Sequence, residues 1–138
     1  MIKNSIKVVA LVFVVVAFSS VGLLLVTRAA QQPTVTRKIL LKQDSPIPGY
    51  EEDLVMVDFP LGAREGRHTH PGSAIIYVQE GTLTLDYEGK PTATYKPGDS
   101  TYVEAGKIHE GRNAGNTPVK VLATFVLKKG VPMTSQVQ

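Results

Sequence analysis

Short segments in which apolar and polar residues alternate recur between residues 37 and 130. Leu83 and Leu85, for example, alternate with Thr82, Thr84 and Asp86, and a period of two is typical of a strand with one buried face. The segments predicted as strands are 38–42, 50–59, 74–79, 82–87, 92–95, 100–103, 108–112 and 119–127. Eight short strands separated by turn residues predict an all-β domain of the sandwich or jelly-roll type.

One pair of these strands predicts a local hairpin. Segments 74–79 and 82–87 flank the dipeptide Glu80-Gly81, and two residues with glycine are a common hairpin connection. We therefore expect these two strands to pair with each other.

The N-terminal pattern is different. The first seven residues are a short segment that carries Lys3 and Lys7. Residues 8–26 are apolar apart from two serines and a glycine. This pattern is typical of an export signal, and the lysines predict that the N-terminus stays on the cytoplasmic side. We expect the rest of the chain to be exported, to the periplasm or the extracellular space.

Two outcomes for this leader stay open. The 19 residues from 8 to 26 span about 28 Å as a helix, close to the hydrocarbon thickness, which favours a retained membrane anchor. Thr27 and Ala29 are small residues at the spacing that a signal peptidase recognises, which favours cleavage.

Charge and cysteine content exclude several classes of function. Three of the 15 basic residues lie in the first 30 positions, which leaves 12 basic and 12 acidic residues beyond them. A neutral domain offers no broad surface for nucleic acid, so none is expected as a partner. The chain has no cysteine, which excludes disulfides, thiolate metal sites and cysteine nucleophiles.

The three histidines are the candidate chemistry. His68 and His70 are two residues apart, so on an extended strand both imidazoles face one side. His109 lies in another predicted strand, which a barrel can bring opposite the pair. Taken alone, this spacing also fits an exposed polar strand and an unrelated loop histidine.

The glycines around the histidines change that balance. Gly62 precedes His68 by five intervening residues and Gly81 follows His70 by ten, while Gly98, Gly106, His109 and Asn113 are separated by seven, two and three residues. The sequence resembles the paired cupin signature, G-x5-H-x-H-x3-E-x6-G and G-x5-P-x-G-x2-H-x3-N, at eight of its ten named positions. The resemblance implies a cupin jelly-roll β-barrel with one divalent metal on His68, His70 and His109.

Two positions depart from the signature. Glu104 stands where the family has proline, which is a mild conformational change unless its side chain faces the pocket. Ala74 stands where the family has its ligand glutamate, so the expected shell is three neutral imidazoles. Imidazole ligands suit Fe²⁺, Ni²⁺, Zn²⁺ and Cu²⁺, and the missing carboxylate makes Mn²⁺ less favoured. Among cupins this shell resembles that of the three-histidine dioxygenases, a resemblance that favours Fe²⁺.

The remaining polar groups near the motifs have ordinary structural explanations. The tyrosines at 77, 87, 95 and 102 are expected to pack on the barrel, and Arg64, Arg67 and Arg112 to be solvated, although an arginine at the mouth could clamp a carboxylate. Asp99 and Asn113 are expected to stabilise turns. The sequence names no catalytic residue and no organic cofactor site.

The expected layout is a signal peptide or anchor over 1–30, a tether over 31–36, a cupin domain over 37–130 and a flexible tail over 131–138. By the resemblance, the metal centre resembles that of three-histidine dioxygenases, so one hypothesis is an oxidoreductase that acts on a small molecule. A non-catalytic module that binds a small ligand or a metal is the alternative, and a metal-free degenerate barrel is a third. Small cupins are often homodimers, so a homodimer is expected.

Overall fold

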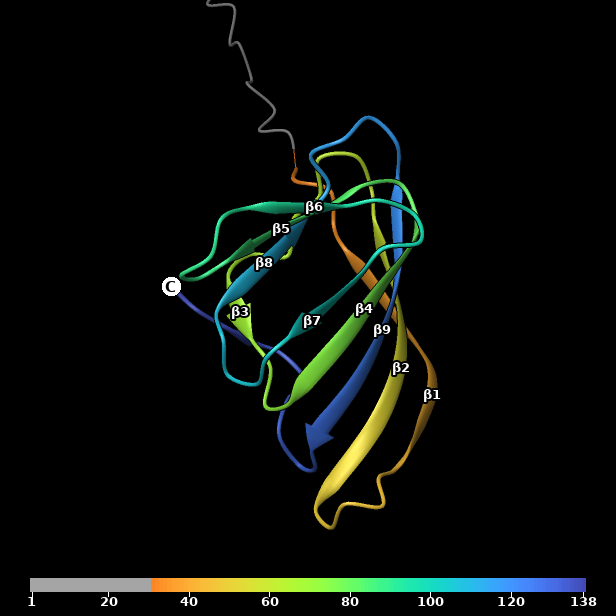
Figure 1. Ribbon diagram of the computed structural model, residues 1–138, viewed down its shortest axis with the longest axis vertical. Coiled ribbons are helices and arrows are strands. Elements are labelled where there is room, and N and C mark those ends of the chain that lie inside the picture. The colour runs from red at the N-terminus through yellow and green to blue at the C-terminus, as the bar shows by residue number, and fades with distance from the viewer. Residues whose placement is uncertain (1–30) are drawn as a thin grey trace, which may run out of the picture.

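The computed structural model describes residues 31–138, in which ten strands form two antiparallel sheets that face each other (Figure 1). The strands are β1 (Thr36–Asp44), β2 (Tyr50–Phe59), β3 (His68–Thr69), β4 (Ser73–Glu80), β5 (Leu83–Tyr87), β6 (Ala93–Tyr95), β7 (Ser100–Val103), β8 (His109–Arg112), β9 (Val119–Lys128) and β10 (Ser135–Gln136). The first sheet has the order β1-β2-β9-β4-β7 and the second the order β10-β3-β8-β5-β6. The all-β class and the two-sheet architecture predicted from the sequence are therefore confirmed.

The alternation of apolar and polar residues places the core between the two sheets. On β9 every second residue from Val119 to Leu127 is buried, and on β2 the same holds from Asp53 to Phe59. Leu83 and Leu85 of β5 complete this core from the opposite sheet. Each sheet thus buries one face, as the period of two requires.

The predicted hairpin at Glu80-Gly81 is wrong. β4 pairs with β7 and β9 in the first sheet, whereas β5 pairs with β6 and β8 in the second. Gly81 has a positive φ of 71°, and a Cβ there would lie 2.3 Å from the carbonyl oxygen of Pro118. This glycine is needed because the chain crosses from one sheet to the other in close contact with the segment that precedes β9.

The C-terminal segment, which the sequence predicts as a flexible tail, adds a strand to the second sheet. Ser135 and Gln136 form β10, which pairs with β3, and the Val137 amide donates to the Arg67 carbonyl at 2.9 Å. Without β10, the backbone N–H and C=O groups on one edge of β3 would lack hydrogen-bond partners, and the C-terminal segment provides them. The end of the chain thereby reaches the strand that carries His68.

The leader and the anchor predicted within residues 1–30 lie outside the described residues. Among residues 31–138 there is no helix long and apolar enough to cross a membrane.

Candidate metal centre

His68, His70 and His109 converge inside the barrel, as the motif spacing predicts. His68 of β3 lies directly opposite His109 of β8 in the antiparallel register, and His70 follows two residues later on the same side. The ring centroids are 4.3 Å apart for His68 and His109, 4.8 Å for His68 and His70, and 4.9 Å for His70 and His109. All three side chains are buried, and one nitrogen of each lies within 4.8 Å of the others.

Backbone carbonyls fix the orientation of all three rings. The Nδ1 atoms of His68, His109 and His70 lie 2.8, 2.9 and 2.7 Å from the carbonyl oxygens of Gly66, Lys107 and Met133 respectively. A carbonyl oxygen only accepts, so each Nδ1 carries the proton and donates it. The unprotonated Nε2 atoms are left to face the cluster, which is how metal-binding histidines are commonly held.

Burial keeps the imidazoles neutral. It lowers the pKa of His68 and His109 and lowers that of His70 to about 4. A neutral imidazole is the form that binds a metal, so the three side chains are ready as ligands near neutral pH. Ligands of one ion at about 2.1 Å lie about 3 to 3.4 Å apart, so small ring movements bring this set to bonding distance. The donor set therefore fits a divalent metal.

The walls beside the histidines are mostly apolar. The Phe125 ring meets the His70 ring edge-on at 4.9 Å between centroids, and the Tyr87 ring stacks on His109 at 6.1 Å. An inner cavity of about 30 Å³ adjoins His70 and His109. Its apolar lining comes from both sheets: Val57, Phe59, Ile76, Leu83, Leu85, Val121, Ala123 and Phe125.

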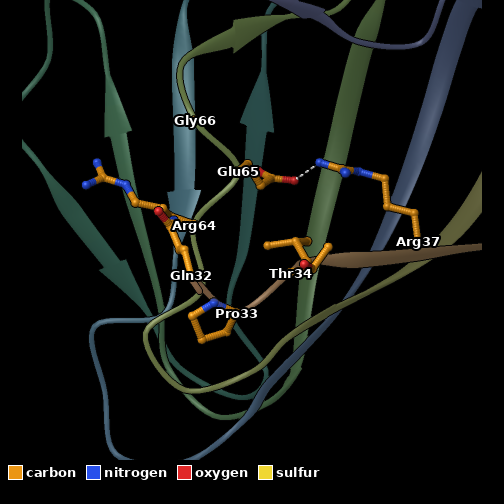
Figure 2. Close-up of a pocket in the computed structure, with 8 residues that line it drawn as sticks. Gln32, Pro33, Thr34, Arg37, Arg64, Glu65 and Gly66 are labelled. Atoms are coloured by element: carbon orange, nitrogen blue, oxygen red, sulfur yellow. Dashed lines mark hydrogen bonds and ion pairs between the residues drawn. The ribbon is translucent and has the colours of Figure 1, made fainter. Parts of the chain in front are cut away.

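Arg37 and Glu65 are two further polar residues at this cavity, and the sequence analysis did not single them out. They line the inner cavity and also an open outer cavity of about 640 Å³. Figure 2 shows the two side chains facing each other as an ion pair, with Arg64 directed elsewhere. Burial raises the pKa of the Glu65 carboxyl, against the opposing effect of the Arg37 guanidinium. Glu65 lies between Gly62 and His68, and this position was the one available hint, because Arg37 lies in no motif.

The three arginines near the motifs are each held by a carboxylate, although Arg64 also lines the outer cavity. Arg64 forms an ion pair with Glu110, with the Arg64 Nε atom 2.6 Å from the carboxylate. Arg112 pairs with Asp86 at 2.7 Å, and Arg67 pairs with Glu88 at 3.2 Å. None of these three arginines lines the inner cavity.

The other motif positions have structural roles. Asn113 is buried and its Nδ2 donates to the carbonyl oxygens of Phe59, Pro60 and Thr117, so it fastens the chain around the second motif. Glu104 is half-buried, and its carboxylate pairs with Lys90 at 3.2 Å. Tyr87 and Tyr95 contribute to the core, whereas Tyr77 and Tyr102 are exposed on the outer face.

Ala74 faces the interior and brings no ligand. It is 1% exposed and pairs in register with Phe125, whose ring contacts His70. The position where the family signature has glutamate is thus on the inner face and carries only a methyl group.

The chain belongs to the cupin family: the model of the cupin domain matches residues 55–125. This range includes both motifs and all three histidines. The expected resemblance is thereby confirmed, together with the jelly-roll interpretation of the two sheets.

Curated relatives include plant and bacterial proteins. Germin-like protein subfamily 2 member 2 of Arabidopsis thaliana is 31% identical over 87 residues, which are 57% of this chain and 40% of that protein. An oxalate-binding protein of Thermotoga maritima is 33% identical over 69 residues, which are 49% of this chain and 56% of that protein. The chain thus spans about half of the length of these relatives.

Solved structures share the fold at low sequence identity. A cupin-like protein of Thermotoga maritima has a TM-score of 0.63 at 22% identity, with 75% of each chain covered. A double-stranded β-helix protein of Klebsiella pneumoniae has a TM-score of 0.61 at 18% identity, covering 79% of this chain and 87% of that one. These similarities establish the architecture.

Proposed function

We propose that this cupin binds one divalent metal ion through His68, His70 and His109 and that the bound metal takes a small chelating organic ligand. The observation that supports the proposal most strongly is the orientation of the rings. Three Nδ1 atoms are committed to backbone carbonyls, so three Nε2 lone pairs are directed into one buried space. A cation is the species that such an arrangement stabilises.

Fe²⁺ is the metal favoured for this site. Imidazole ligands suit Fe²⁺, Ni²⁺, Cu²⁺ and Zn²⁺, and first-row affinity by itself does not choose among them. When bound, such a metal supplies open positions at which a chelating ligand can be polarised and oriented.

Small organic anions are the proposed ligand class. The three neutral imidazoles leave the charge of a divalent ion uncompensated, which favours an anion at its open positions. The inner cavity of about 30 Å³ has room for about two waters, so the larger part of a ligand would occupy the outer space. One curated relative is named an oxalate-binding protein, which is consistent with a small carboxylate ligand.

An oxidoreductase of the dioxygenase type is the catalytic form of this proposal. The apolar residues Leu83, Leu85 and Phe125 exclude bulk water beside the histidines, and such a wall also admits dioxygen. In this function the chain's own residues bind the organic substrate, orient it and keep water away from it.

A non-catalytic binding module is the second candidate. The inner cavity brings Glu65 as its one carboxylic acid among the described residues, and Arg37 holds that group in an ion pair. A site with one ion-paired carboxylic acid offers little for proton transfer, which favours holding a ligand over converting it.

Export and self-association complete the proposal. The pattern of residues 1–30 supports export to the periplasm or outside the cell, with either release or membrane anchoring by residues 8–26. The edge strand β1 exposes Ile39, Leu40 and Leu41, which supports a homodimer that covers this edge.

Oxygen consumption separates the two candidates. The protein is loaded anaerobically with Fe²⁺, and oxygen uptake is measured with a panel of small mono- and dicarboxylic acids, hydroxy acids and diketones. Uptake that depends on one class of substrate and disappears in His109→Ala supports the oxidoreductase. Saturable binding of a panel member without uptake supports the binding module, and neither binding nor uptake contradicts the proposal that the metal takes a chelating ligand.

A further inference from the structure

Glu65 reaches the histidine cluster from the loop before β3. Its side chain is 12% exposed, its Oε1 atom is paired with Arg37, and its Oε2 atom lies 3.9 Å from Nε2 of His68. The Gly111 amide donates to the same Oε2 atom at 3.2 Å. One carboxylate oxygen is therefore occupied by Arg37, and the other is turned towards the histidines.

The approach of Glu65 to His68 brings two hydrogen-bond acceptors together. His68 donates its Nδ1 proton to the Gly66 carbonyl, so its Nε2 atom carries a lone pair. The Oε2 atom of Glu65 carries lone pairs as well. Two such atoms facing each other in a buried space repel unless a cation or a donor lies between them. The same cation that the three Nε2 atoms stabilise would also satisfy Glu65.

Gly111 provides the space for this carboxylate. A Cβ on Gly111 would lie 2.7 Å from Oε2 of Glu65 and 3.2 Å from the ring of Phe59. Gly111 is two residues beyond His109 on β8, so it lies on the same face of the strand as that histidine. A side chain at this position would push the carboxylate away from the cluster.

We propose that Glu65 is the carboxylate ligand of this metal centre and that Arg37 positions it through the other oxygen. The inference rests on the proposed function, namely metal binding by His68, His70 and His109. It adds a negative charge to a donor set that is otherwise neutral, from a residue before His68, whereas Ala74 follows His70. A carboxylate ligand makes Mn²⁺ a better match for the site than three imidazoles alone.

The substitution Glu65→Gln tests this role with little change of shape. The amide keeps an oxygen for the Gly111 N–H but loses the charge. The affinities for Zn²⁺ and Mn²⁺ are measured by competition with a chromophoric chelator. We expect a loss of about tenfold or more, by comparison with the 10- to 100-fold cost of losing a supporting group. The loss should be larger for Mn²⁺ than for Zn²⁺, because carboxylate oxygen matters more to Mn²⁺.

The visible absorption spectrum of bound Co²⁺ gives a readout that is independent of affinity. Replacement of a carboxylate ligand changes this spectrum, whereas a change in general stability does not. Glu88→Gln is the matched control, because Glu88 is also paired with an arginine but lies exposed on the surface. We expect the control to keep both the affinities and the spectrum of the wild type.

The substitution Gly111→Ala tests the same role without removing any donor. Its added methyl group should displace the Glu65 carboxylate and reproduce the direction of the Glu65→Gln changes. It also serves if Glu65→Gln fails to fold.

Wild-type affinity and an unchanged Co²⁺ spectrum in either folded variant would overturn the ligand role of Glu65. If these variants behave like the wild type, while the wild type binds metal and His109→Ala does not, only the role of Glu65 is overturned and the proposed function stands. If the wild type binds no metal, the proposed function fails together with it.

Discussion

The histidine cluster and Asp53 are both buried polar groups on the inner side of the barrel, but their surroundings differ. Each histidine donates to a backbone carbonyl that fixes its ring, and the free nitrogens meet at one place. Asp53 of β2 is 1% exposed, and among the described residues neither of its carboxylate oxygens has a hydrogen-bond partner. Its nearest countercharge is Lys42, whose Nζ atom lies 3.6 Å away.

The difference between the two regions shows which property of a buried polar group indicates a binding site. Burial alone carries a desolvation cost, which both regions share. In the cluster, three nitrogen lone pairs with fixed orientation converge, so a single cation can offset the desolvation cost. Asp53 stands alone on its strand, with apolar residues at the next inward positions, Val55 and Val57. Convergence and orientation, more than burial, therefore mark the candidate site.

The largest expected effect is stabilisation by metal. At a free metal concentration of 100 times the dissociation constant, binding to the folded state raises the free energy of unfolding by about 2.7 kcal/mol. We expect Zn²⁺ to have this effect on the wild type and on Asp53→Asn but not on His68→Ala. Urea denaturation with and without metal measures it. Equal stabilisation of His68→Ala would remove the distinction between the two regions.

A pH effect of similar size follows from the burial of His70. Its pKa is about 4 in the folded, metal-free protein, against about 6.5 when unfolded. As pH falls below 6.5, the unfolded state binds the proton first, so stability is lost between pH 6.5 and 4. At pH 5 the loss amounts to about 2 kcal/mol relative to pH 7.

The variant His70→Leu isolates this contribution. Unfolding of the metal-free wild type and of the variant is measured in urea at pH 7 and at pH 5. The variant should lose less stability between the two pH values than the wild type does. An identical loss in both proteins would show that His70 does not carry the effect.

A smaller effect of opposite sign is expected at Asp53. A buried carboxylate that lacks hydrogen-bond partners carries a desolvation cost of about 1 to 3 kcal/mol, which an apolar residue of similar size removes. Asp53→Leu should therefore raise the free energy of unfolding by about 1 kcal/mol, with metal affinity unchanged. A destabilisation of that size in urea denaturation would show that the ion pair with Lys42 outweighs the desolvation cost of the carboxylate.

The smallest effect is expected at the exposed pair of Arg67 and Glu88. Both side chains are 54% exposed, and exposed ion pairs contribute about 0 to 1 kcal/mol. Arg67→Gln should change the free energy of unfolding by less than about 0.5 kcal/mol and leave Zn²⁺ affinity unchanged. A tenfold change in affinity would give this arginine a role at the site after all.

The sequence predicted strands better than their partners. β2 and β7 have the bounds that alternation and turn residues predict, because those signals are local. The pairing of β4 with β5 failed, because the choice of sheet depends on contacts with β9 and β8, which are distant in sequence. β3 and β10 have two residues each, too few to show any alternation.

The candidate site was likewise predictable only in part. Motif spacing brought His68, His70 and His109 together, because the barrel register that pairs β3 with β8 is a property of the fold. The carbonyl of Met133, which orients His70, comes from the tail that was expected to be flexible. Arg37 and Glu65 meet only because β1 folds against β2, with Arg37 opposite Val57. No local pattern encodes these contacts.

Metal binding by three converging imidazoles can be tested without knowledge of the ligand. The most direct test is the metal content of the purified protein after equilibration with excess divalent metal and removal of the free ion, measured by mass spectrometry of the elements. We expect about one ion per chain in the wild type and a loss of nearly all of it in His109→Ala, with Asp53→Asn unchanged. A wild-type protein without bound metal, or a His109→Ala variant that keeps it, would show that the three histidines are not a metal site.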